Sequence, residues 1–219
     1  MGEAAVDDDG DPGGMVTEQA RLRDNAATLE RELNWLARLI DVRMKHYFKL
    51  EDAGTELPAS VFEIPPPSFP EPAVPYAAFV DHYKFDFSER AAFALALAPS
   101  LRPQLLDIFF TRNQTYDRRF TEFGGLVGGP DGAFIPTGET LAFILGGVDV
   151  ETRLLVEALF DATHRFATQQ IFRGSEDPLR APLHIISSSE VDPTLGKDSI
   201  TSGVKAVIIG TIAVLLFML

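Results

Sequence analysis

The chain has 219 residues, of which 46% are hydrophobic, so it can bury a core of ordinary size. Its formal net charge of -13 repels phosphate backbones, so no nucleic-acid partner is expected. The absence of cysteine from the sequence excludes disulfides, thiolate zinc sites and cysteine nucleophiles.

An acidic segment opens the chain, and a long helix is expected after it. Residues 1–16 contain little that can be buried, so they are predicted to form a disordered acidic tail. Residues 17–49 are predicted to form a long amphipathic helix, because apolar residues recur every three or four positions. The apolar stripe consists of Leu22, Ala26, Leu29, Leu33, Leu36, Ile40, Met44 and Tyr47. Packing against the chain's own domain is the favoured interpretation, and a coiled coil that makes a homo-oligomer is the alternative.

A proline-rich segment follows the helix. Seven of the fifteen prolines fall between Pro58 and Pro75. Because proline lacks an amide donor and restricts the residue before it, residues 50–75 are predicted to be an extended linker. A spacer laid across the surface is the favoured interpretation, and a ligand for a proline-binding domain is the alternative.

The globular domain is predicted to span residues 76–203, and most of the phenylalanines that can fill its core lie there. Ser88, Thr137 and Asp149 are suited to cap the second, fourth and fifth of its helices, and Pro99 is suited to stop the second. The helices are predicted at 76–84, 88–98, 102–112, 137–146 and 150–172. The expected fold class is therefore mainly α.

A glycine-rich stretch between the third and fourth helices predicts a small β-hairpin over residues 123–136. Its turn signal is Pro130-Asp131-Gly132, which has short apolar runs on both sides. A hairpin beside helices makes the fold winged-helix-like α+β. A phosphate-binding loop would need Lys and then Ser or Thr after its last glycine, but Gly132 is followed by Ala133 and Phe134, so no nucleotide cofactor is expected.

The C-terminal tail is apolar, and residues 204–219 are a candidate transmembrane anchor. No charged residue occurs from Ala206 onward. A helix over the uncharged residues 206–219 would rise about 21 Å, whereas the hydrocarbon core of a bilayer is about 30 Å thick, so the span would be short. Lys205 favours a cytoplasmic domain anchored to the inner membrane from that side. A buried core element is the alternative for the tail, and a short strand is predicted at 183–186.

Candidate functional residues are few. Arg118 and Arg119 follow Asp117 in a charged segment, where their guanidinium groups could clamp a carboxylate of a protein partner. The alternative is an ion-pair cluster within the domain that also includes Asp107 and Glu122. The four histidines lack the spacing of a metal site, so no metal is expected. No complete catalytic motif occurs in the sequence, and the chain is not expected to be an enzyme.

Several segments, taken together in their order and spacing, resemble a known family over about residues 30–195. They are Leu95-Ala96-Leu97-Ala98-Pro99, Asp117-Arg118-Arg119-Phe120, Phe123-Gly124-Gly125, Gly132-Ala133-Phe134-Ile135-Pro136-Thr137-Gly138-Glu139-Thr140 and Phe143-Ile144-Leu145-Gly146. They resemble the N-terminal region of the AAA-type ATPases associated with extracellular contractile injection systems. Those ATPases continue into a domain with Walker motifs, whereas this chain turns into an apolar tail, so ATP hydrolysis is not carried over.

The resemblance implies a non-catalytic adaptor module near such an assembly, with an injection-system component as its protein partner. The candidate partner-binding residues are Arg118, Arg119 and Glu139, and tethering through the tail at 204–219 would add a membrane contact. A truncated or orphaned ATPase fragment with no activity of its own is the first alternative. A hydrolase that uses carboxylates such as Asp117 and Glu122 is the weaker second alternative.

Overall fold

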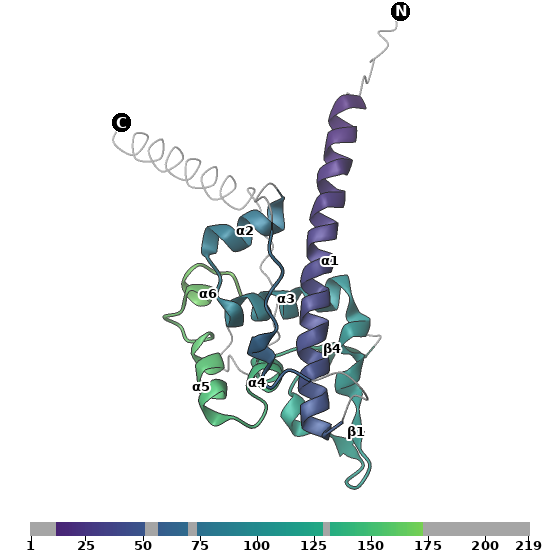
Figure 1. The fold of residues 1–219 in the computed structure, drawn as a ribbon, viewed down its shortest axis with the longest axis vertical. Helices are drawn as coiled ribbons and strands as arrows, with labels where there is room; N and C mark the ends of the chain where they lie inside the picture. The colour runs from purple at the N-terminus through teal and green to yellow at the C-terminus, as the bar shows by residue number, and fades with distance from the viewer. Residues whose placement is uncertain (1–11, 51–56, 70–73, 129–131, 173–219) are drawn as a thin grey trace, which may run out of the picture. The chain divides into compact units, whose positions relative to one another are not determined.

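The computed structural model describes residues 12–50, 57–69, 74–128 and 132–172 (Figure 1). The residues described are mainly helical and contain two small antiparallel strand pairs, which confirms the mainly α class. Every element below belongs to the first of the chain's two units, Met1–Ile185. The start of the acidic tail, the strand predicted at 183–186 and the anchor predicted at 204–219 lie outside the described residues.

The long helix α1 spans Pro12–Phe48, so it begins before residue 17, where the sequence pattern placed its start. The second half of its apolar stripe is buried in the core, including Leu33, Leu36 and Ile40. In the first half, by contrast, Leu22 is 61% exposed. The predicted packing against the chain's own domain is observed from about Asn25 onward, where Asn25 Oδ1 accepts a hydrogen bond from the Tyr76 amide and Thr28 is buried.

The middle of the proline-rich segment belongs to the core, so the prediction of a spacer laid across the surface is wrong there. A short 3-10 helix, η1, spans Val61–Glu63, and both Val61 and Ile64 are buried. The carbonyl oxygen of Ile64 accepts a hydrogen bond from Trp35 Nε1 on α1 at 3.0 Å. The physical reason is that apolar residues between the prolines fill space against α1, which proline content does not reveal.

Helices α2 and α3 span Pro75–Tyr83 and Phe87–Leu101. Asp86 caps α3 in place of the predicted Ser88, because the Asp86 carboxylate accepts a hydrogen bond from the Glu89 amide while Glu89 bonds back to the Asp86 amide. Pro99 lies inside the last turn of α3 and does not stop it. Pro99 removes only the one amide bond that would run to the Leu95 carbonyl, and the helix ends two residues later.

The segment after α3 is wound more tightly than the α-helix that the sequence predicted. The element expected as a helix at 102–112 is a 3-10 helix, η2, over Pro103–Phe110. It leads into a strand pair that the sequence analysis did not predict, formed by β1, Arg112–Asn113, and β2, Arg118–Arg119. Strands of this length carry too few residues for an alternating pattern to be visible in the sequence.

The predicted β-hairpin is present. After a short 3-10 helix η3, Thr121–Phe123, strand β3, Leu126–Gly128, pairs antiparallel with β4, Ala133–Ile135. Gly132 in the connection has a φ of +64°, which glycine adopts without steric cost. The hairpin therefore follows the turn signal, although its strands are shorter than the predicted range of 123–136.

Helix α4 spans Gly138–Gly146 and α5 spans Val150–Ala158, with Thr137 and Asp149 at their predicted N-cap positions. The single helix predicted at 150–172 is wrong, because the chain turns after α5 and resumes as α6, Arg165–Thr168. In the turn, Asp161 accepts a hydrogen bond from the Thr163 amide and His164 Nδ1 accepts one from the Phe166 amide. Such local side-chain bonds compete with a continuous helix.

Helix α4 lies at the centre of the core, and every residue from Thr140 to Gly146 is buried. It contacts α1, α3 and α5. Arg43 of α1 donates hydrogen bonds to the carbonyl oxygens of Ile144 and Leu145, which satisfies backbone groups at the end of α4. Burial lowers the pKa of this arginine. The core thus fixes α4, whose first turn carries Glu139.

Candidate functional site

Two clefts open on either side of Glu139, in the first turn of α4. The first cleft, of about 420 Å³, is formed by the end of β2, η3, the two glycines after it, and the start of α4. It is lined by Arg119, Phe120, Thr121, Gly124, Gly125, Leu126, Thr137 and Glu139. The second cleft, of about 230 Å³, lies between α4 and α5 and is lined by Glu139, Ala142, Val150, Arg153, Leu154 and Glu157. We call these two clefts together the Glu139 surface.

Arg119 lies in the first cleft with part of its hydrogen-bonding capacity unused. Its guanidinium carbon lies 5.4 Å from the centre of the Phe134 ring and 5.8 Å from that of Phe110. Arg119 Nη2 donates a hydrogen bond to the carbonyl oxygen of Gly124 at 3.2 Å. The buried Nε has no hydrogen-bond partner among the described residues. The aromatic contacts hold the guanidinium in place, and the half-buried side chain lines the cleft, where its guanidinium could pair with a ligand's oxygen.

The structure separates Arg118 from this site. Arg118 and Arg119 are consecutive residues of β2, and consecutive side chains of a strand point to opposite faces. Arg118 is exposed, and its guanidinium lies over the ring of Tyr116 at 5.5 Å. Of the three predicted partner-binding residues, only Arg119 and Glu139 therefore line one cleft.

The ion-pair cluster proposed as the alternative role of these arginines is not formed among the described residues. Asp117 pairs with Arg112 at 3.1 Å, and Glu122 accepts a hydrogen bond from the Tyr47 hydroxyl at 3.1 Å. Burial, followed by the charge of Glu122, raises the pKa of the Tyr47 hydroxyl. Neither carboxylate lines the first cleft, so Arg119 is not neutralised by them.

Glu139 pairs with Arg153 of α5 at 2.8 Å, and its side chain is 34% exposed. Arg153 also donates a hydrogen bond to the carbonyl oxygen of Gly147 at 3.1 Å. A carboxylate in the first turn of a helix is favourably placed for the helix dipole. The pair joins α4 to α5 at the point where the two clefts meet, and its exposure leaves room for contacts with another molecule.

Two glycines form part of the wall of the first cleft. Gly124 has a φ of +60°, and a Cβ added there would lie 2.5 Å from Glu139 Cβ. Gly125 has a φ of +71°, and a Cβ added there would overlap the ring of Phe134. The Gly125 amide donates a hydrogen bond to the Thr137 hydroxyl at 3.2 Å. These close approaches bring η3 against the start of α4 and so place Arg119 near Glu139.

Sequence analysis missed the contribution of α5 and Arg153 to the site. Leu154 of α5 lines the second cleft and is 60% exposed, although it has the residue type of a core position. The sequence of α5 could have indicated an exposed apolar face, because its apolar residues lie on more than one face of the helix. Val156 alone is buried against the domain, which leaves the others uncovered. The sequence could not show which of these faces the domain would cover.

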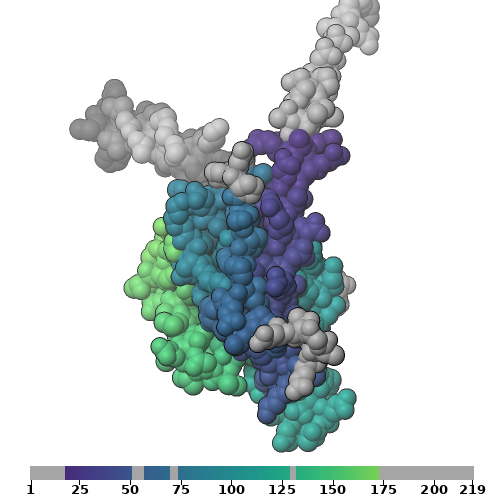
Figure 2. Space-filling model, viewed as in Figure 1, coloured from purple at the N-terminus to yellow at the C-terminus, as the bar shows by residue number. Residues whose placement is uncertain are grey.

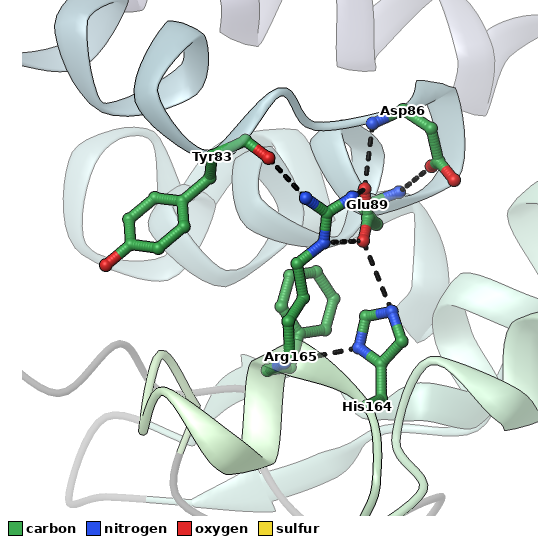
Figure 3. Close-up of polar contacts among 6 residues, drawn as sticks. Tyr83, Asp86, Glu89, His164 and Arg165 are labelled. Carbon is green, nitrogen blue, oxygen red and sulfur yellow. Dashed lines mark hydrogen bonds and ion pairs between the residues drawn. The ribbon is translucent and has the colours of Figure 1, made fainter.

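A separate cluster of charged residues surrounds Glu89, which is 1% exposed (Figure 3). Arg165 donates hydrogen bonds to both oxygens of Glu89 and to the carbonyl oxygen of Tyr83, and His164 Nε2 lies 3.2 Å from Glu89 Oε1. The Asp86 amide adds a hydrogen bond at 2.8 Å. The cluster ties α6 to the start of α3, and its groups are occupied by one another.

A second buried pair joins α1 to α3. Arg90 Nε and Nη2 each lie 2.6 Å from an oxygen of Glu32, and Nη2 also donates to the carbonyl oxygen of Pro67 at 2.7 Å. The guanidinium lies 4.4 Å from the centre of the Phe69 ring. The Tyr76 hydroxyl has no hydrogen-bond partner among the described residues, and burial raises its pKa. This pair holds the proline-rich segment against the core.

The described residues contain no group of three or more His, Cys, Asp or Glu side chains that could hold a metal ion. No single helix in this part of the chain is long and apolar enough to cross a membrane. The consecutive elements α3 and η2 satisfy the length and composition together, but they meet at a bend of 100°.

Comparisons of the chain with protein-family models, with curated proteins and with solved structures find no match. The resemblance to the ATPases of contractile injection systems therefore stays a prediction. The candidate site rests on the geometry of the Glu139 surface, where a half-buried guanidinium, a partly exposed ion pair and an exposed apolar helix lie next to one another.

Proposed function

We propose that this chain is a non-catalytic interaction module that docks a protein partner on the Glu139 surface. The observation that carries the proposal is the half-buried guanidinium of Arg119 in the first cleft, beside the ion pair of Glu139 with Arg153. Protein interfaces are enriched in arginine and aromatic residues, and their energy comes from a few well-packed anchors. Arg119, stacked on aromatic rings, is the anchor that this surface offers.

The chemistry of the first cleft favours an acceptor group on the partner. A carboxylate or a backbone carbonyl of the partner would accept hydrogen bonds from the guanidinium of Arg119 where it lines the cleft, and such charge-assisted bonds are among the strongest in proteins. Glu139 would in turn accept from a cation or an amide of the partner. Because both groups are already positioned, little side-chain ordering would be needed on binding.

The hairpin is proposed to act as the wing of a winged-helix-like domain. Leu126 and Val127 of β3 are exposed, and Leu126 lines the first cleft beside Arg119. An apolar strand at the edge of a cleft would extend the interface beyond the charged groups. The wing would thus contribute apolar contact area while Arg119 fixes the position of the partner.

Two further parts of the proposal come from the sequence. Residues 204–219 are proposed to anchor the module to the inner membrane, and their apolar composition supports this. An injection-system component is proposed as the partner, supported by the ordered resemblance described above. Pairing between chains of the part of α1 before Asn25 would make a homo-oligomer, and the exposure of Leu22 is compatible with it.

The docking proposal is tested with the tagged full chain expressed in its source organism. Proteins recovered with the wild type are quantified, and the chief one is purified so that its dissociation constant can be measured. We expect Arg119→Glu and Glu139→Lys each to raise that constant about tenfold or more, the effect of losing one anchor. Glu18→Lys, a charge reversal on exposed α1, is the matched control and should have no effect. Equal dissociation constants for all four proteins would overturn the proposal.

The anchoring proposal has its own test. The full chain is fractionated next to a version that ends at Gly203, and both are followed by immunoblotting. We expect the full chain in the membrane fraction and the shorter version outside it. Finding both outside the membrane fraction without detergent would remove the anchor from the proposal and leave the docking surface unaffected.

A further inference from the structure

The outward face of α5 and the residues before it carry a group of exposed apolar side chains, which we call the α5 apolar row. Val148 is 86% exposed, Val150 67%, Leu154 60% and Leu155 65%. Val150 and Leu154 are one helical turn apart and so lie next to each other on one face. Single exposed apolar residues are ordinary, but a contiguous group of large ones marks an interaction site.

The fold does not need the α5 apolar row. Val156 of α5 and Leu159 after it are buried, and they attach this part of the chain to the core. In the view of Figure 2, α5 lies at the surface of the molecule. Polar side chains at Val150, Leu154 and Leu155 would therefore serve the domain at least as well as the apolar ones do. Their apolar character calls for a different explanation.

A cleft lies directly beside the α5 apolar row. Val150 and Leu154 form one wall of the second cleft of the Glu139 surface, and Ala142 of α4 lies on the other side. The cleft has a volume of about 230 Å³, which is enough for one or two apolar side chains. A partner that covers the row could therefore also insert a side chain into the cleft between α4 and α5.

Acidic side chains surround the row. Asp149, Glu151, Glu157 and Asp161 are all exposed. The single basic residue of α5, Arg153, is already paired with Glu139 at 2.8 Å. The carboxylate of Asp149 stays ionised readily, because hydrogen bonds from Thr152 lower its pKa. The apolar row therefore has an acidic rim, in which Glu151 and Glu157 form no ion pair among the described residues.

We propose that the α5 apolar row docks an amphipathic helix of the partner protein, with leucine-like side chains on its apolar face and lysine or arginine on its flanks. An apolar helix face laid into a groove is a common mode of peptide recognition. Basic flanks would pair with the acidic rim and would speed association, whereas an acidic helix would be repelled. This inference rests on the proposed function, because it assigns the partner's chemistry on one side of the Glu139 surface.

The test uses two synthetic helical peptides as probes. One carries leucines at i, i+3, i+4 and i+7 with lysine at the other positions, and the matched control replaces every lysine with glutamate. Binding to the full chain is measured by fluorescence anisotropy at physiological salt. We expect saturable binding of the Leu/Lys peptide and binding at least about tenfold weaker for the Leu/Glu peptide. Equal binding of the two peptides, or no binding of either, would overturn the inference.

Variants of the full chain locate the binding site. We expect Leu154→Gln with Leu155→Gln, and separately Glu151→Lys with Glu157→Lys, to weaken binding of the Leu/Lys peptide about tenfold. Leu22→Gln is the matched control, because Leu22 is also exposed but lies on α1. Equal weakening by Leu22→Gln, or no effect of either double variant, would show nonspecific adhesion and overturn the inference.

One more arm examines the chain's own apolar tail as the occupant. If the Leu/Lys peptide binds a version that ends at Gly203 but not the full chain, residues 204–219 cover the row and the partner helix is overturned. Equal binding to both versions supports the partner helix. The proposed function fails separately, through Arg119→Glu and Glu139→Lys with the purified partner, so loss of the α5 inference would leave that result intact.

Discussion

The Glu89 and Glu139 carboxylates each pair with an arginine, but their surroundings differ. Glu89 is 1% exposed and is bonded by Arg165, His164 and the Asp86 amide. The side chain of Glu139 is 34% exposed, and it lies between two open clefts. A carboxylate saturated by its own domain holds elements together, whereas a half-exposed one beside open clefts retains capacity for another molecule.

The first prediction breaks the buried pair. Glu89→Ala leaves the guanidinium of Arg165 without its carboxylate and removes half of the capping box of α3. We expect the free energy of unfolding to fall by about 3–5 kcal/mol, as it does when one partner of a buried pair is lost. Urea denaturation monitored by circular dichroism measures the change. A loss below about 1 kcal/mol would mean that the cluster does not stabilise the fold.

The second prediction concerns the glycines that position the first cleft. Gly125→Ala would place a methyl group into the ring of Phe134 at a positive φ, so we expect a loss of about 2–4 kcal/mol. Gly132→Ala is the matched control, because Gly132 also has a positive φ but its nearest neighbour is Val127 at 3.8 Å. It should cost about 1–2 kcal/mol. Equal losses in urea denaturation would show that the close approach to Phe134 is unimportant.

The third prediction concerns Glu139, the more exposed of the two carboxylates. Glu139→Gln keeps the shape of the side chain and removes the charge that pairs with Arg153. Because the ion pair is partly exposed and screened by solvent, we expect the free energy of unfolding to change by less than about 1 kcal/mol. The same denaturation measurement as for Glu89→Ala allows direct comparison. A loss as large as that of Glu89→Ala would assign Glu139 a structural role.

The smallest expected effect is a pH dependence at the start of α5. Hydrogen bonds from the Thr152 hydroxyl and amide lower the pKa of Asp149 in the folded protein. The stabilisation is therefore present above the unfolded pKa of about 3.9 and is lost as the pH falls through the lower folded value. Between about pH 6 and pH 3, wild type should lose more stability than Asp149→Asn. Parallel loss in both proteins would contradict this assignment.

The parts of the fold that depend on residues close together in the sequence could be predicted. The stripe of α1 and the turn signal at Gly132 each act over a few residues, and the helix and hairpin they predict are present. The burial of Val61 and the break between α5 and α6 were missed. Both depend on contacts with distant parts of the chain or on competing side-chain bonds, which periodicity does not reveal.

The candidate site was only partly predictable for the same reason. Arg119 and Glu139 were both named from the sequence, but no pattern placed them in one cleft. Their meeting depends on Gly124, whose positive φ lets η3 approach the start of α4. The adjacent Arg118 has the same residue type and yet lies away from the cleft, because strand β2 alternates its side chains.

The central claim is that a protein partner docks on the Glu139 surface, and hydrogen exchange tests it most directly. Amide exchange of the full chain is followed by mass spectrometry, free and in complex with the partner recovered as described above. We predict slower exchange in residues 119–127 and 138–158, which carry the two clefts and the α5 apolar row. Protection confined to the part of α1 before Asn25, or no protection in either of these ranges, would contradict the claim.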